Sequence, residues 1–245
     1  MGHLALVRHA QASLFSANYD QLSDRGREQA AALGRYWRET GRGPARVTRW
    51  LTGPAQRHID TAALCRAERF AAQPDDWPAA EVHDAFDEHD AFAMIKKGMP
   101  QLMELEPDLA DLARAAQSEP DPAKRSGAWQ KAFEVIMARW LDDEVHAEGV
   151  ESWPEFEARV LGGIDTILRE ASESGGKQRI VLFTSVGPTA VFLRRALRLA
   201  PLDAFRTAWR QRNASRSDFL FRGDALTLDS FNRVEHLPPE LHTHR

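Results

Sequence analysis

The chain has 245 residues, of which 28% are charged and 43% are hydrophobic. Its 32 basic and 36 acidic side chains give a formal net charge of −4. This apolar content excludes a disordered chain, and the weakly acidic balance argues against a nucleic-acid partner, which needs a basic face. An anion-binding site in such a chain must therefore be a local cluster of arginines.

The chain contains one cysteine, Cys65, which excludes an internal disulfide and any zinc or iron–sulfur site made from several cysteines. Its longest apolar run, residues 180–193, is interrupted by Gly187 and Pro188 and is too short to cross a bilayer. The N-terminus has no basic stretch or cleavage site of the kind that signal peptides carry. We therefore expect a cytoplasmic protein without a membrane partner, metal or other cofactor. Nothing in the sequence indicates its oligomeric state.

Apolar runs bounded by breakers predict three short strands in the first third of the chain, at residues 3–7, 47–52 and 81–86. Two segments with a helical period alternate with these strands, at residues 22–40 and 57–69. Ser23 or Asp24 is the expected N-cap of the first helix, which Gly41 and Gly43 should end.

Residues 91–173 read as almost continuous helix, with breaks expected at Pro100, Pro107, Gly149 and Pro154. Within this region the polar, proline-rich segment 118–127 predicts a loop. Residues 179–184 (RIVLFT) predict a buried strand, and a helix ending near Leu199 should follow it. Residues 219–221 and 225–231 predict a hairpin that turns at Gly223 and Asp224.

This alternation of strands and helices predicts an α/β fold with three layers, in which a mostly parallel central sheet carries helices on both faces. We expect residues 1–245 to form a single domain. Residues 91–149 lie outside the alternation and predict a helical insertion. The insertion follows directly on the third strand region, so we expect it to lie over the carboxyl edge of the sheet and to shape access there.

Polar side chains follow four of the predicted strands, where the carboxyl ends of parallel strands meet at one edge. Arginines bind phosphate oxygens through two parallel hydrogen bonds, a neutral imidazole is a competent nucleophile, and a carboxyl group can protonate a leaving oxygen. A helix N-terminus also attracts anions. Together these groups predict phosphoryl transfer. The candidate residues are Arg8, His9, Arg57, Glu88, Ser185 and Gly187.

The pattern resembles the histidine phosphatase superfamily, also called the phosphoglycerate-mutase-like family. The segments that carry the resemblance occur in the family's order and cover nearly the whole chain except residues 91–148. They are LVRHAQAS, YDQLSDRGREQAAALG, TGPAQRHIDTA, HDAFDEHDAF, GVESWPEFEARV, IVLFTSVG and FNRVEHL.

The resemblance implies a phosphoric monoester hydrolase with a phosphohistidine intermediate and a small phosphorylated substrate. On this basis His9 is the nucleophile and Glu88 the general acid and base. Arg8 and Arg57 bind the substrate phosphate, together with the turn that contains Ser185 and Gly187. The scheme requires no metal.

Two positions depart from the family pattern: Ala10 stands where glycine is usual, and Val186 stands where the family places a second histidine. Valine offers no hydrogen-bond donor, and removal of one donor from such a site lowers rates by about 10²–10³-fold in other enzymes. We therefore expect weak activity, which Val186→His should raise. The Ser185 hydroxyl, amides near Gly187, or a histidine elsewhere (His58 or His89) are candidates for the missing contact.

Two alternatives to a phosphatase remain open. One is a phosphate-binding pseudo-enzyme that Val186 has left catalytically impaired. The other is a phosphoglycerate-type mutase. A mutase needs further basic groups to hold a bisphosphate, and only Lys96 and Lys97 follow Glu88 closely.

Overall fold

The computed structural model describes residues 1–13, 20–41, 47–71, 78–175 and 177–244. The chain forms two compact units, residues 1–88 with 160–245, and residues 89–159. The second unit contains the segment 91–149 that the sequence sets apart as an insertion. Among the helices of the described residues, none is long and apolar enough to cross a membrane.

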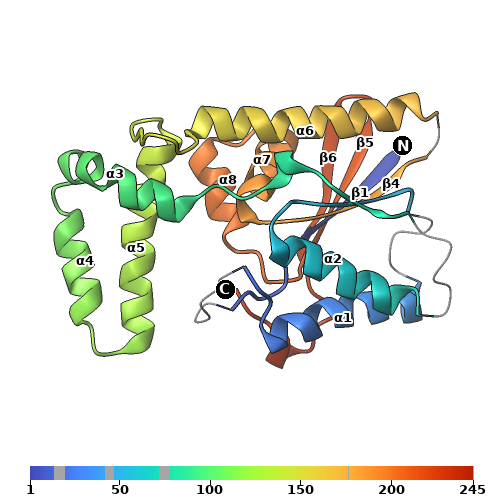
Figure 1. Ribbon diagram of the computed structural model, residues 1–245, viewed down its shortest axis with the longest axis horizontal. Coiled ribbons are helices and arrows are strands. Elements are labelled where there is room, and N and C mark those ends of the chain that lie inside the picture. Colours follow the sequence, from blue (N-terminus) through green and yellow to red (C-terminus); the bar gives the residue numbers. More distant parts are fainter. Residues whose placement is uncertain (14–19, 42–46, 72–77, 176, 245) are drawn as a thin grey trace. The chain divides into compact units, whose positions relative to one another are not determined.

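The first unit is built on a six-stranded sheet with the strand order β3-β2-β4-β1-β5-β6 (Figure 1). In chain order the strands are β1 (Gly2–Arg8), β2 (Arg49–Thr52), β3 (Ala80–Val82), β4 (Arg179–Thr184), β5 (Arg216–Arg222) and β6 (Ala225–Arg233). β1 runs parallel to β4 and antiparallel to β5, and the pairs β2–β4 and β2–β3 are parallel. This mixed, mostly parallel sheet with flanking helices confirms the predicted α/β class.

The first helices of the chain pack on one face of this sheet (Figure 1). α1 (Asp24–Thr40) begins at the N-cap Ser23, whose side chain accepts a hydrogen bond from the Gly26 N–H at 3.0 Å. It ends at Gly41, whose left-handed conformation (φ 63°) suits glycine. Gly43, the second expected stop, lies outside the described residues. α2 (Gln56–Arg69) follows the Gly53-Pro54 break.

The buried face between these helices and the sheet is rich in large side chains. Trp50 of β2 contacts Trp37 edge-on at 6.2 Å between ring centres, and its ring lies 5.1 Å from that of Phe183 in β4. Cys65 of α2 is buried in the same cluster. Buried aromatic area of this kind stabilises the sheet and so fixes the strand ends that carry the polar residues.

The predicted third strand is shorter than expected. Only Ala80–Val82 pair as β3, and residues Asp84–Phe86 form a 3₁₀ turn, η1. Pairing ends where the His83 N–H donates to the Thr52 carbonyl at 2.8 Å. The turn carries the Phe86 ring into the interior, where it is completely buried, while the β3 side chains stay exposed at the sheet edge. Burial of the Phe86 ring therefore ends strand pairing after Val82.

After β4 the chain forms α7 (Val186–Leu197) and α8 (Pro201–Ala208). α7 ends two residues before the predicted Leu199, because Arg198 adopts a left-handed conformation and Pro201 starts the next helix. The predicted hairpin is confirmed as β5 and β6, which turn at Gly223 with φ 58°.

The second unit is helical, with α3 (Ala91–Leu105), α4 (Leu109–Ser118), α5 (Pro122–Leu141) and the start of α6 (Trp153–Glu173). The Trp140, Trp153 and Phe156 rings pack together in its interior, with ring centres 5.5–5.9 Å apart. α6 continues along the chain into the first unit.

Several expected breaks in this region are wrong. Residues 122–127 are the start of α5 rather than a loop, because proline is tolerated in a first helical turn and the Asp121 carboxylate accepts from the Lys124 N–H at 3.3 Å. Pro154 likewise lies in the first turn of α6. Pro100 lies inside α3, where burial of Met94, Gly98 and Leu102 on one face supports the helix across it. Pro107 and Gly149 do lie between helices.

Candidate active site

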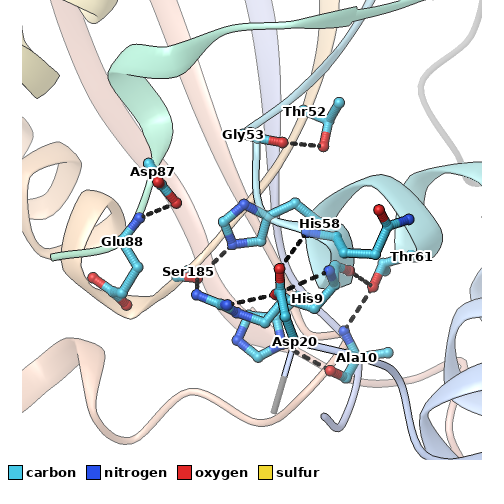
Figure 2. Close-up of polar contacts among 12 residues, drawn as sticks. His9, Ala10, Asp20, Thr52, Gly53, His58, Thr61, Asp87, Glu88 and Ser185 are labelled. Carbon is cyan, nitrogen blue, oxygen red and sulfur yellow. Dashed lines mark hydrogen bonds and ion pairs between the residues drawn. The ribbon is translucent and has the colours of Figure 1, made fainter. Parts of the chain in front are cut away.

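The candidate residues come from four places in the first unit. Arg8 ends β1 and His9 follows it. Arg57 and His58 lie in the first turn of α2, Glu88 follows η1, and Ser185 joins β4 to α7. Arg8 pairs with Thr184, and Thr52 pairs with Phe183, so three parallel strands end level with one another. Figure 2 shows His9, His58, Ser185 and Glu88 gathered at this edge.

His9 is held in a single tautomer. Its Nδ1 lies 2.8 Å from the Ala10 carbonyl oxygen, which can only accept, so Nδ1 carries the proton and Nε2 keeps a free lone pair. The backbone is fixed too, because the His9 N–H donates to the Thr184 carbonyl and the His9 carbonyl accepts from the Ala214 N–H.

Burial lowers the pKa of His9 well below its usual value near 6.5, and the charges of Arg57 and Arg8 lower it further. A neighbouring cation and burial away from solvent both oppose protonation of an imidazole. His9 is therefore a neutral base at neutral pH.

The two arginines are anchored differently. Arg8 is buried, and its Nη1 donates to the Gln211 carbonyl. Arg57 donates through Nη1 to the Asp20 carboxylate at 2.7 Å and through Nη2 to the Ser185 hydroxyl at 3.4 Å. Both guanidinium groups thus have fixed positions beside His9.

Asp20 is a site residue that the sequence analysis does not identify, although it lies in the quoted segment YDQLSDRGREQAAALG. Its carboxylate accepts from the Gln56 and Arg57 backbone N–H groups, at 2.8 and 3.3 Å, and so caps α2. Burial alone would raise the pKa of Asp20, but these two N–H groups and the Arg57 charge together lower it. Asp20 is thus a carboxylate that holds both the helix end and Arg57.

His58 contacts Ser185 from inside the protein. Its Nε2 lies 2.5 Å from the Ser185 hydroxyl oxygen, and its ring centre lies 5.7 Å from that of His9. Burial, and then the Arg57 charge, lower the pKa of His58 to about 3. His58 is therefore neutral and completely buried at neutral pH.

Glu88 lies at the N-terminus of α7. Both of its carboxylate oxygens accept from the Gly187 N–H at 3.1 Å, and its own N–H donates to the Asp87 side chain at 2.8 Å. Glu88 and Gly187, predicted as acid and phosphate ligand, are thus in direct contact.

The two histidines considered as replacements for a second site histidine have different surroundings. His58 contacts the Ser185 hydroxyl. His89 belongs to the second unit, where its ring stacks on Trp140 at 4.8 Å and meets Phe156 edge-on at 5.7 Å. Val186 is the first residue of α7 and brings no polar side chain to this turn.

The assembled groups suit phosphoryl transfer. An unprotonated imidazole nitrogen, two fixed guanidinium groups, a hydroxyl and a carboxyl group lie together at one sheet edge, which is what attack on a phosphate ester requires. Within the part of the chain that the structure describes, no group of three or more histidine, cysteine or acidic side chains is placed to hold a metal ion.

Comparison with known proteins points the same way. Residues 89–234 match the model of the histidine phosphatase superfamily (branch 1). No protein of curated function matches the sequence.

Solved structures with a similar fold include a phosphoglycerate mutase from Bacillus anthracis str. Sterne (18% identity, TM-score 0.62, covering 96% of this chain and 94% of that one). They also include a mycobacterial glucosyl-3-phosphoglycerate phosphatase (18% identity, TM-score 0.60, coverage 95% and 99%). A third is an H9A mutant of a phosphoserine phosphatase from Entamoeba histolytica in complex with phosphoserine (14% identity, TM-score 0.57, coverage 97% and 100%). At these identities the likeness is one of fold.

Proposed function

Because the chain belongs to the histidine phosphatase superfamily (branch 1), we propose that it is a phosphomonoester hydrolase that acts through a phosphohistidine intermediate. The observation that carries this proposal is the state of His9. Its Nδ1–H is engaged by the Ala10 carbonyl, so the other nitrogen is available to attack phosphorus.

In the first step the lone pair of His9 Nε2 forms a bond to phosphorus, and the bond from phosphorus to the ester oxygen breaks. Glu88 gives its proton to the departing oxygen, which leaves as an alcohol. Arg8 and Arg57 neutralise the charge that builds on the equatorial oxygens of the phosphoryl group. The products are phosphorylated His9 and the free alcohol.

In the second step a water molecule attacks the phosphorus of phosphorylated His9, and the nitrogen–phosphorus bond breaks. Glu88, now a carboxylate, takes the proton from this water, so inorganic phosphate is released and both side chains return to their starting states. A single carboxyl group thus acts first as acid and then as base.

The substrate phosphate is proposed to bind Arg8, Arg57, the Ser185 hydroxyl and the Gly187 N–H. The Gly187 N–H now donates to Glu88, so a bound phosphate would compete with this carboxyl group for it. Phosphoserine and 3-phosphoglycerate derivatives, named in two of the similar structures, are small phosphomonoesters that also carry a carboxylate. They are the first physiological compounds to assay.

The test is hydrolysis of p-nitrophenyl phosphate together with chemical trapping of the intermediate. We expect turnover by the wild type, an acid-labile and base-stable phosphoryl group on His9 after rapid quenching, and loss of both in His9→Ala. His3→Gln, at the opposite end of β1, is the matched control and should retain activity. A phosphoryl group on another residue would contradict the proposed nucleophile.

Two further outcomes select the alternatives. Binding of inorganic phosphate without hydrolysis of any phosphomonoester would select the pseudo-enzyme, which Val186 makes a specific alternative. Transfer of the phosphoryl group to a second hydroxyl of the substrate instead of water would select the mutase.

We also propose that segment 91–149 shapes substrate access, because it follows Glu88 directly in the chain. Phe92 and Trp129 are exposed large side chains of this segment. Replacing either with serine should change KM for bulky phosphomonoesters and leave kcat for p-nitrophenyl phosphate unchanged. An unchanged KM across substrates of all sizes would contradict this role.

A further inference from the structure

We propose that His58 is a positioning residue that fixes the Ser185 hydroxyl as a hydrogen-bond donor to the substrate phosphate, and so provides the contact that Val186 does not. This inference rests on the proposed function and concerns the same site. The sequence offers His58 and the Ser185 hydroxyl as separate candidates for this contact, and the inference joins them as one hydrogen-bonded pair.

The contact between the two side chains is short and buried. His58 Nε2 lies 2.5 Å from the Ser185 hydroxyl oxygen, and both residues are almost completely inaccessible to solvent. Arg57 Nη2 lies 3.4 Å from the same oxygen. The hydroxyl is thus held between an imidazole and a guanidinium group, and the His58 ring lies beside that of His9.

The number of protons around this oxygen determines where the hydroxyl proton goes. A serine hydroxyl has one proton and two lone pairs, and Arg57 can only donate to it. If His58 carries its proton on Nε2, the oxygen accepts from both neighbours, and its own proton is left for a third partner. A phosphate oxygen bound by Arg57 is such a partner.

The surroundings of His58 favour this tautomer. Among the described residues, no group is placed to hydrogen-bond its Nδ1, which is buried. A proton on Nδ1 would therefore be a buried donor without an acceptor, which is rarer and less favourable than an unpaired lone pair. His58 is then protonated on Nε2, whereas His9 is protonated on Nδ1.

The backbone next to His58 leaves space for the ring in this position. A Cβ atom at Gly53 would lie only 2.5 Å from His58 Nδ1, so any residue other than glycine would displace the imidazole. The Gly53 N–H in turn donates to the Phe183 carbonyl at 2.9 Å, which ties this glycine to the end of β4. The strand ends therefore fix the position of His58 relative to Ser185.

The first test is a double-mutant cycle that combines His58→Met, which fills a similar volume without a donor, with Ser185→Ala. If His58 acts through the hydroxyl, His58→Met should lower kcat on the order of tenfold in the wild type and less than about twofold in Ser185→Ala. His58→Gln, whose amide can donate to Ser185, should recover most of the loss. Thermal melts establish that each variant is folded.

The cycle is also measured on the affinity for inorganic phosphate, by calorimetry, so that it does not depend on turnover. We expect each single variant to bind phosphate several-fold more weakly, and the double variant no more weakly than Ser185→Ala. Equal effects of His58→Met in both backgrounds, or a His58→Gln variant as impaired as His58→Met, would overturn the inference. If His9→Ala abolishes activity and His58→Met leaves it unchanged, only the role of His58 is refuted. If the protein shows no turnover but its phosphate affinities follow the expected double-mutant cycle, only the hydrolase activity is refuted.

Nitrogen NMR of the histidine-labelled protein tests the tautomers directly, even where a His58 variant does not fold. We expect a protonated Nε2 for His58 and a protonated Nδ1 for His9. A protonated Nδ1 on His58 would overturn the inference.

The inference also changes what is expected of Val186. With His58 in place, Val186→His should not raise activity, contrary to the expectation from sequence alone, because the donor is already supplied. In the His58→Met background the same substitution should raise kcat. A rise of similar size in both backgrounds would overturn the inference.

Discussion

The Asp20 carboxylate lies 2.7 Å from Arg57 Nη1, so an arginine proposed to bind phosphate already holds an internal anion. The same carboxylate accepts from two backbone N–H groups at the start of α2. Its negative charge thus lies close to the proposed phosphate site. Asp20 therefore fixes the direction of Arg57 and at the same time weakens its attraction for a second anion.

Replacing Asp20 with asparagine should strengthen phosphate binding. The amide oxygen can still cap α2, while the negative charge beside Arg57 is removed. Because the pair is partly exposed, we expect a modest gain in affinity, on the order of threefold, and a stability loss below about 1 kcal/mol. Calorimetry with inorganic phosphate measures the affinity, and a thermal melt measures the stability. Weaker binding in Asp20→Asn would show that the orientation of Arg57 matters more than the charge.

Stability should fall as the pH is lowered from about 6.5 toward 3. Burial lowers the pKa of His9 well below 6.5, that of His58 to about 3 and that of His236 to about 4. The unfolded chain binds protons at these residues at higher pH than the folded one, so their contribution is complete above pH 6.5 and is lost as the pH falls. Each unit of difference corresponds to about 1.4 kcal/mol.

Denaturant unfolding between pH 7 and pH 4 checks this dependence, and His58→Gln should flatten it. The same pKa shift of His9 predicts that kcat/KM keeps its plateau below pH 6.5. A stability that is constant over this range would show that these histidines have the same pKa in the folded and the unfolded chain.

Glu88→Gln should distinguish substrates by their leaving groups. p-Nitrophenolate departs without needing a proton, whereas the serine alkoxide of phosphoserine needs one. Phosphorylation of His9 by phosphoserine should therefore slow by about 10²–10⁴-fold, the usual contribution of a general acid. Phosphorylation by p-nitrophenyl phosphate should change far less. Rapid-quench measurement of this step with both compounds gives the comparison, and equal slowing would exclude Glu88 as the acid.

Trp140→Ala should destabilise the second unit. The Trp140 ring is buried and contacts His89, Trp153 and Phe156, so its removal leaves a large cavity. Such substitutions cost about 3–5 kcal/mol. Hydrogen exchange should show faster exchange in residues 89–159, and Trp129→Ala, at an exposed position, is the control. Unchanged exchange in this unit would contradict the packing of these rings.

The positions of the strand ends could be predicted because they depend on simple patterns. Residues 180–183 are continuously apolar and buried in the sheet, and the polar residues that follow such runs lie at the carboxyl edge. His9 and Ser185 directly follow such strands, and Arg57 lies in the first turn of the helix after β2. The α/β class follows from the same alternation of strands and helices.

Other features depend on contacts between distant segments, which periodicity does not encode. The ion pair between Asp20 and Arg57 joins segments 37 residues apart. The contact between His58 and Ser185 spans 127 residues. The third strand ends earlier than the sequence predicts because burial of the Phe86 ring, rather than local strand propensity, decides where pairing ends.

The central position of β1 has a consequence for how this protein is made. β1, which ends at Arg8 directly before His9, is synthesised before the other five strands of the sheet, yet both of its neighbours, β4 and β5, lie in residues 179–222. A nascent chain shorter than this cannot enclose His9, so its lowered pKa and its fixed tautomer arise only late in synthesis. Strands that are this far apart in the sequence also pair slowly during folding. Until then the apolar residues of β1 remain exposed, and they are the segment of the growing chain for which a chaperone would be most needed.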